Sequence, residues 1–188
     1  MIKQLAVVSA ILVLGSDVNG ASNTDLTLKQ IEGKPPLDSI ASQTDIISSE
    51  DINCLALNSY FESRNQSPNG GIAVTHVVLN RVSDDRYPDT ICEVVQDASK
   101  NSNGTLRRNK CQFSWYCDGL SDKPRDTPAW IDALNRALRA VHLYESGFDI
   151  SHGSTHYHSK NVQPYWSKTI EYITTIDDHH FYKWGKPG

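Results

Sequence analysis

The sequence has no excess of positive charge and no long hydrophobic stretch. It contains 18 Lys and Arg against 22 Asp and Glu, so its net charge is −4 with His neutral. This balance argues against nucleic-acid binding through a global basic field, because neutralising phosphates requires a cationic surface. It does not exclude a local basic groove. The chain of 188 residues shows no internal repeat and is long enough for one hydrophobic core.

Residues 1–21 are predicted to form a secretory signal peptide. Lys3 provides a positive start, Leu5–Leu14 is apolar, and small residues lead to Gly20-Ala21. The apolar run of ten residues is too short to span a bilayer comfortably. A membrane anchor with weak flanks and an uncleaved signal are the alternatives. In each case we expect an exported domain, in the periplasm or outside the cell, and no stable membrane association once the signal is cleaved.

Only four cysteines are present, and none is arranged as CxxC. An even number in an oxidising compartment indicates two disulfides, for which three pairings exist. The short segment between Cys111 and Cys117 suits a local disulfide, and that choice leaves Cys54 with Cys92. Zinc ligation is disfavoured because the spacing typical of zinc sites is missing.

Beyond the signal, residues 22–48 show no sustained period and contain a Pro-Pro pair, which predicts a linker or arm. Residues 49–186 are predicted to form the single folded domain. Capping signals predict helices that begin after Ser48, Ser67 and Thr90, the third covering ICEVVQDA. A polar loop is expected at 99–110 and short β-strands from Ser154 onward. The pattern indicates a mostly helical α+β domain.

The strongest helical pattern follows Thr127, which we expect to be the N-cap, with Pro128 in the first turn and Gly147 past the end. Its buried stripe is predicted to consist of Trp130, Ile131, Leu134, Leu138, Val141 and Tyr144.

Glu62 is the first candidate for chemistry. It lies at a predicted helix end beside aromatic residues, where burial raises the pKa of a carboxyl group and suits it to general acid catalysis. On position alone, an ordinary surface glutamate is the more common interpretation.

Histidines and aromatic residues are concentrated in the second half of the chain. Five of the seven histidines lie between His152 and His180, and His156 and His158 would point the same way on a strand. Such a cluster suits a metal or a polar groove without metal. No HExxH motif is present, so we predict no metal and no cofactor. Aromatic side chains such as Trp115 and Trp166 suit either a sugar-binding groove or the core.

Six segments occur in an order that identifies a family resemblance. They are FESRNQ from Phe61, AVTHVVLNRV from Ala73, CQFSWYCDG from Cys111, THYH from Thr155, PYW from Pro164 and HHFY from His179. In this order they resemble the cell wall hydrolases of the spore-cortex-lytic (SleB-like) type, particularly their exported or phage-associated branch. The resemblance runs from about Cys54 to Trp184.

The resemblance implies a lysozyme-like α+β fold and a muramidase or lytic transglycosylase that acts on peptidoglycan glycan strands with a single catalytic glutamate. Glu62 matches the first acid of the family's EARGE-like box and is implied as the catalytic residue. The implied substrate-binding residues are Asn80, Arg81, Gln112, Phe113, Ser114, His156, Tyr157, His158, Trp166, His179 and Tyr182. We expect a monomer.

The chain departs from the family pattern after Glu62. The second acid of the box is Gln66, which cannot transfer a proton, and the usual Gly is Asn65. With one carboxylate, attack by the muramyl 6-hydroxyl gives a 1,6-anhydro end, whereas retaining and inverting glycosidases use two. Candidates for a second acid are Asp118, Asp177 and Asp178. The alternatives are a metal-dependent wall amidase or peptidase built on the histidines, and a glycan-binding module with a decayed site.

Overall fold

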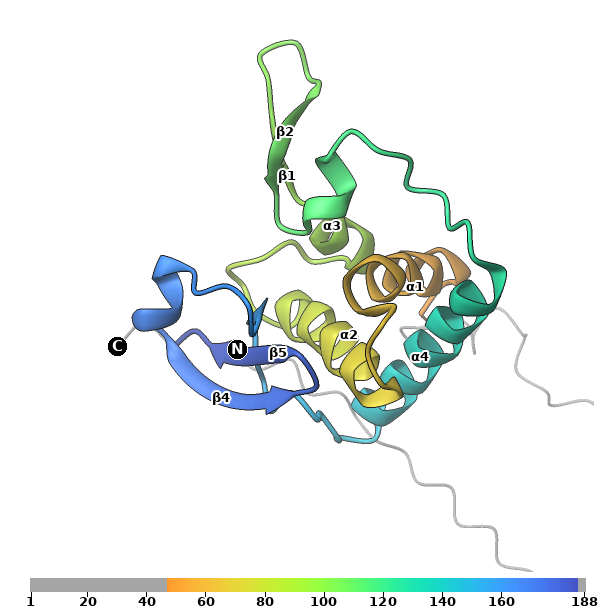
Figure 1. Ribbon diagram of the computed structural model, residues 1–188, viewed down its shortest axis with the longest axis vertical. Helices are drawn as coiled ribbons and strands as arrows, with labels where there is room; N and C mark the ends of the chain where they lie inside the picture. Colours follow the sequence, from red (N-terminus) through yellow and green to blue (C-terminus); the bar gives the residue numbers. More distant parts are fainter. Residues whose placement is uncertain (1–46, 186–188) are drawn as a thin grey trace, which may run out of the picture. The chain divides into compact units, whose positions relative to one another are not determined.

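Figure 1 shows a computed structural model in which residues 47–185 are described. The predicted signal peptide and all but the last two residues of the predicted arm lie outside the described residues. Within 47–185, no helix is both long and apolar enough to cross a bilayer.

Four α-helices form the larger part of the domain: α1 (Ser49–Ser63), α2 (Pro68–Val82), α3 (Ile91–Val95) and α4 (Thr127–Glu145). Their starts follow local capping chemistry. Ser48 and Asp51 form the predicted capping box of α1, and Ser67 caps α2 ahead of Pro68. Thr90 caps α3 as expected, but that helix ends at Val95, earlier than predicted.

Helix α2 is buried along most of its length and packs against both α1 and α4 (Figure 1). Gly71 makes this close packing feasible, since a Cβ there would lie 2.5 Å from Cδ of Arg136 on α4.

Helix α4 differs from the prediction in two ways. Its N-cap is Asp126 rather than Thr127, because the Asp126 carboxylate accepts the bond from the Ala129 amide.

The predicted buried stripe of α4 is also partly wrong. Ile131 and Leu138 are 51% and 53% exposed. The fully buried positions are the small ones, Ala133, Ala137 and Ala140, together with Val141. Small side chains let α4 approach α1 and α2 closely, so the stripe is set by backbone distance and not by the largest apolar residues.

Two small antiparallel sheets complete the domain. Strands β1 (Ala98–Lys100) and β2 (Leu106–Cys111) form a hairpin where we predicted a polar loop. A turn ending at Gly104 reverses the chain, with the Gly104 amide donating to the Asn101 carbonyl. The second sheet has the order β3-β5-β4, from β3 (His156–Ser159), β4 (Glu171–Ile176) and β5 (His179–Lys183). Short 3₁₀ helices η2 (Ser114–Cys117) and η3 (Tyr165–Lys168) precede α4 and β4.

The core has two parts. The larger lies among the helices and includes Leu55, Val78 and Phe113. The smaller joins α2 to the three-stranded sheet through Val77 and Phe181. Disulfides join Cys54 to Cys92 and Cys111 to Cys117, the pairing that the spacing suggested. The domain is a mostly helical α+β fold, as predicted.

Candidate functional site

Glu62 lies in the last turn of α1, half-buried against the second sheet. Tyr157 in β3 donates a hydrogen bond from its hydroxyl to Oε2 of Glu62 over 3.1 Å. The turn after Glu62 is fixed from α4, because Arg136 donates to the Ser63 carbonyl at 3.0 Å and to the Gln66 carbonyl at 3.2 Å. Three separate elements therefore determine where the carboxyl group lies.

Burial raises the pKa of Glu62 above its usual value, while the Tyr157 hydroxyl and the charge of Arg81 oppose that rise. Arg81 is only 5% exposed, and burial lowers the pKa of its guanidinium. Its Nε donates to the Thr155 carbonyl at 2.8 Å. A protonated carboxyl group at moderately acidic pH is what a general acid requires.

Arg81 lies between two aromatic rings. Its guanidinium is 5.2 Å from the ring centroid of Tyr87 and 5.1 Å from that of Phe113. Its Nη1 is buried and has no hydrogen-bond partner among the described residues. A buried charge held this way beside Glu62 is costly to maintain, which is typical of functional sites.

The α1 side of the site is aromatic. Phe61 stacks on Trp115 of η2 with ring centroids 4.9 Å apart. Trp115 donates from Nε1 to Oδ1 of Asn58 at 3.1 Å, one helical turn before Glu62. The Nδ2 of Asn58 is buried without a partner among residues 47–185. Asn58 was not among the residues predicted for the site, although a polar residue one turn before Glu62 was the available signal.

The second sheet divides the predicted residues between its two faces. Tyr157 shares one face with His179 and Phe181, at ring distances of 5.2 and 5.7 Å. The Nδ1 of His179 is buried and has no partner in the described part of the chain. Burial lowers the pKa of His179, and His158 adds to this while Asp178 and Asp177 oppose it. This face is the one that carries the contact with Glu62.

The opposite face holds the other aromatic and histidine residues. His156 and His158 do point the same way, since both rings pack against Trp166. Nε2 of His158 is 3.0 Å from the Tyr182 hydroxyl. Burial lowers the pKa of His156 to about 4, and the charge of Arg81 contributes. These four residues form a separate cluster that does not touch Glu62.

The histidines occupy polar and aromatic contacts in the structure. Among residues 47–185, no group of three or more His, Cys, Asp or Glu side chains is placed to hold a metal ion. His76 was not singled out from the sequence. It is fully buried on α2, with Nε2 3.0 Å from the Ala140 carbonyl and Nδ1 3.0 Å from Asp149.

The other predicted binding residues lie at different places. Phe113 is buried under Arg81, whereas Gln112 and Ser114 on either side are exposed. Asn80 faces the loop before β3, where its Nδ2 donates to Asp149, Ser151 and the Ser154 carbonyl. Asn80 thus fixes the loop that leads into the strand carrying Tyr157.

Gln66 is bonded to the turn between β4 and β5. Its Nε2 donates to the Asp178 carboxylate at 3.4 Å, and the Asp178 amide donates to its Oε1 at 3.0 Å. Asp177 accepts from the amide and hydroxyl of Ser67 at the start of α2. Asp118 accepts from the Leu120 amide. Each candidate second acid therefore has a local structural partner.

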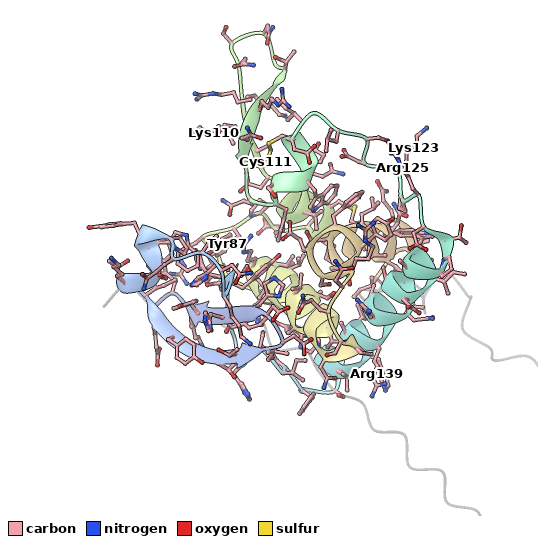
Figure 2. The ribbon with its side chains drawn as sticks, viewed as in Figure 1. Tyr87, Lys110, Cys111, Lys123, Arg125 and Arg139 are labelled. Carbon is pink, nitrogen blue, oxygen red and sulfur yellow. A yellow bond between two sulfur atoms is a disulfide. The ribbon has the colours of Figure 1, made fainter. Side chains whose placement is uncertain are left out.

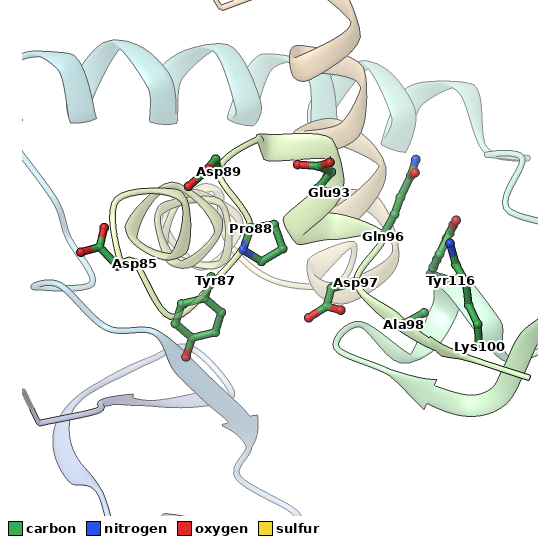
Figure 3. A pocket seen from close by; sticks show the side chains of 10 residues that line it. All are labelled: Asp85, Tyr87, Pro88, Asp89, Glu93, Gln96, Asp97, Ala98, Lys100 and Tyr116. Atoms are coloured by element: carbon green, nitrogen blue, oxygen red, sulfur yellow. The ribbon is translucent and has the colours of Figure 1, made fainter. Parts of the chain in front are cut away.

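A cavity of about 640 Å³ lies next to the site. Its lining residues are Asp85, Tyr87, Pro88, Asp89, Glu93, Gln96, Asp97, Ala98, Lys100 and Tyr116. Figure 3 shows Asp85 and Tyr87 toward one end and Lys100 with Tyr116 at the other. Glu62 does not line this cavity. The connection runs through Tyr87, whose ring packs on Arg81.

Comparisons with known proteins agree with this fold. Residues 65–182, a range that begins just after Glu62, match the family described as Cell Wall Hydrolase. The catalytic domain of the germination-specific lytic transglycosylase SleB from Bacillus anthracis is 24% identical, with a TM-score of 0.55, over 75% of this chain and 100% of that chain. The catalytic domain of SleB from Bacillus cereus is 25% identical, with a TM-score of 0.55, over 74% and 94%. No curated protein sequence matches the chain.

Proposed function

Because the chain belongs to the cell wall hydrolase family, whose substrate is peptidoglycan, we propose that it cleaves glycan strands as a lytic transglycosylase with Glu62 as its acid and base. The observation that carries this proposal is the half-buried Glu62 carboxyl, bonded to Tyr157 and lying in the field of Arg81. The SleB catalytic domains, similar in fold, support the reaction type.

In the proposed reaction, protonated Glu62 donates its proton to the glycosidic oxygen between N-acetylmuramic acid and N-acetylglucosamine. The C1–O bond breaks and leaves positive charge on the muramyl ring. The Glu62 carboxylate then takes the proton of the muramyl 6-hydroxyl, whose oxygen bonds to C1. The products are a 1,6-anhydro end and a new 4-hydroxyl, and Glu62 has regained its proton.

Two features of the site support a single-glutamate reaction. Burial favours the protonated form that must start the cycle. The Tyr157 hydroxyl and the charge of Arg81 stabilise the carboxylate that exists in the middle of it. Asp118, Asp177 and Asp178 each hold local hydrogen bonds, and none of the hydrogen bonds among residues 47–185 joins them to Glu62.

We also propose that the domain is exported and acts outside the cytoplasm. Two disulfides are the usual mark of an oxidising compartment.

The test is mass spectrometry of soluble fragments released from peptidoglycan sacculi by the purified mature protein. Muropeptides with 1,6-anhydro ends are expected from the wild type. Glu62→Gln should lose at least about 100-fold in rate. Glu145→Gln is the matched control, because Glu145 is an exposed residue at the end of α4.

Other products would contradict the proposal in different ways. Reducing muramyl ends would mean hydrolysis by water. Cleaved peptide stems, or products that Glu62→Gln leaves unchanged, would refute glycan cleavage by Glu62. Binding to sacculi without any product would indicate a glycan-binding module.

A further inference from the structure

The hairpin Ala98–Cys111 carries a concentration of positive charge in an acidic chain. It contains Lys100, Arg107, Arg108 and Lys110 and no Asp or Glu, whereas the whole chain has a net charge of −4. We call this segment the cationic hairpin. An acidic protein and an anionic polymer repel each other at long range, so a local cationic element changes where they can meet.

The backbone of the hairpin gathers these charges. Ala98 pairs with Cys111 and Lys100 pairs with Leu106, so 107–110 lies opposite the single residue Ser99. This bulge breaks the alternation of a regular strand and re-aims its side chains. Asn109, at a φ of 58°, provides the left-handed residue that the bulge needs. The bulge therefore interrupts the strict two-face alternation along the stretch that carries Arg107, Arg108 and Lys110.

The charges on the hairpin are exposed and form no ion pair with a carboxylate of residues 47–185. All residues of 99–110 are exposed. Within residues 47–185, the only ion pairs are His76 with Asp149 and Arg86 with Asp84. Arg108 bonds to a backbone carbonyl, that of Asp118, at 2.9 Å. Lys100 lines the cavity that also contains Asp85, Asp89, Glu93 and Asp97. Arg107 and Lys110 therefore carry the test.

The base of the hairpin is attached to the wall of the Glu62 site. The disulfide between Cys111 and Cys117 ties the end of β2 to η2. Trp115 in that helix stacks on Phe61, the neighbour of Glu62. Figure 1 shows the hairpin extending away from the helices, with Lys110 labelled in Figure 2. The disulfide and the ring contact link the base of the hairpin to the helix end that carries Glu62.

We propose that the cationic hairpin binds the carboxylates of the peptide stems that flank the cleaved glycan. This inference rests on the proposed function, because it takes peptidoglycan as the polymer at Glu62. Each exposed cation contributes little, about 1.4- to 5-fold in affinity per pair, and the contribution falls as salt increases. Four cations on one short segment provide a salt-dependent second contact outside the groove.

The experiment measures binding of the full mature chain to sacculi in the Glu62→Gln background, so that cleavage does not remove the polymer. Arg107→Gln with Lys110→Gln should weaken binding about tenfold at low salt and much less at high salt. Arg139→Gln with Lys168→Gln removes the same charge elsewhere and should have little effect. Thermal unfolding of each variant checks that it is folded.

Two further polymers identify the anionic group. On glycan strands freed of their stems, the hairpin variant and its parent should bind equally. On sacculi stripped of phosphate-containing accessory polymers, the tenfold difference should persist. Its disappearance there would overturn the proposal in favour of phosphate binding.

The remaining outcomes separate this proposal from the proposed function. Equal binding of parent and hairpin variant to intact sacculi, or no binding by the parent, would refute the role of the hairpin. Glycan cleavage by the wild type would stand in that case. Loss of binding in the hairpin variant, combined with cleavage that does not depend on Glu62, would keep the hairpin contact and refute the proposed reaction.

Discussion

The Tyr157 hydroxyl donates to Oε2 of Glu62 over 3.1 Å, between residues 95 positions apart in the chain. The bond joins the last turn of α1 to β3. It acts against burial, which raises the pKa of Glu62, by stabilising the charged carboxylate. The strength of the acid at this site thus depends on the packing of a sheet against a helix end.

Replacing Tyr157 with Phe should raise the pKa of Glu62 further, because the hydrogen bond that lowers it is removed. The alkaline limb of the pH profile of kcat/KM should move to higher pH, since the protonated acid then persists longer. The rate below that limb should fall about tenfold, because the carboxylate intermediate loses its donor. The ring contacts with His179 and Phe181 are kept by the substitution.

An unchanged pH profile would contradict this role for the hydroxyl. Tyr165→Phe serves as a control, because Tyr165 is 83% exposed. The pH profile of kcat/KM of this variant should match that of the wild type.

Glu62→Gln should stabilise the fold near neutral pH. A raised pKa in the folded state means that the folded chain binds the proton more tightly than the unfolded chain. The stabilising contribution of Glu62 is therefore lost as pH rises, first through the pKa of Glu62 in the unfolded chain and then through its pKa in the folded chain. Glutamine cannot ionise, so the melting temperature of the Glu62→Gln protein should exceed that of the wild type by a few degrees at pH 7.

The difference in melting temperature should vanish in acid, where Glu62 is protonated in both states. Calorimetry at several pH values provides the measurement. A Glu62→Gln protein that is less stable than the wild type at pH 7 would show that the carboxylate is net favourable in the fold.

Local signals explain what could be predicted from the sequence. Ser48, Ser67 and Thr90 each cap a helix through bonds to residues within one turn, so their neighbours reveal them. The hairpin was not predicted because 99–110 is rich in Asn, Arg and Lys, which have low strand propensity. The disulfide from Cys111 to Cys117 holds the end of β2, a constraint that strand propensity does not include.

The candidate site also has some features that the sequence could predict and others that it could not. Glu62 was found through the resemblance and its helix-end position. Its contact with Tyr157 and the field of Arg81 arise from packing between distant segments, which spacing along the chain does not encode. Alternation along β3 separates Tyr157 from His156 and His158, but which face meets Glu62 is decided only by the register with β5.

Asn80 should behave as a structural residue. Its Nδ2 bonds to Asp149, Ser151 and the Ser154 carbonyl, at 2.9, 3.1 and 3.0 Å respectively. Asn80→Ala should lower the free energy of unfolding by about 1–3 kcal/mol, because buried acceptors lose their donor. Urea unfolding measures this, with Asn135→Ala on the exposed side of α4 as the control.

Acid should reduce the effect of Asn80→Ala. Burial raises the pKa of Asp149, but hydrogen bonds from His76, Ser151 and Asn80 outweigh burial and hold this pKa well below its usual value. The stability that Asp149 contributes is present above its unfolded pKa and is lost as pH falls toward its folded pKa. A loss of substrate affinity without any loss of stability would instead give Asn80 the binding role that the resemblance implied.

Gln66→Glu restores the acid found at this position in the family pattern, and we expect it to be unfavourable here. The new carboxylate would face that of Asp178, which now accepts from the Gln66 amide at 3.4 Å. Repulsion at this exposed pair should cost about 0.5–1 kcal/mol of unfolding free energy at pH 7. The cost should shrink in acid, because protonation of the introduced glutamate removes the repulsion. Asp178→Asn in the same chain should restore stability by removing the second charge.

The rate of glycan cleavage distinguishes a structural from a chemical role at position 66. If one glutamate suffices, Gln66→Glu should not raise kcat, and its products should keep their 1,6-anhydro ends. The contact of Gln66 with Asp178 is directed to the turn between β4 and β5, which is why we expect no gain. A large increase in kcat, or a change to reducing muramyl ends, would show that a second carboxylate takes part when it is supplied.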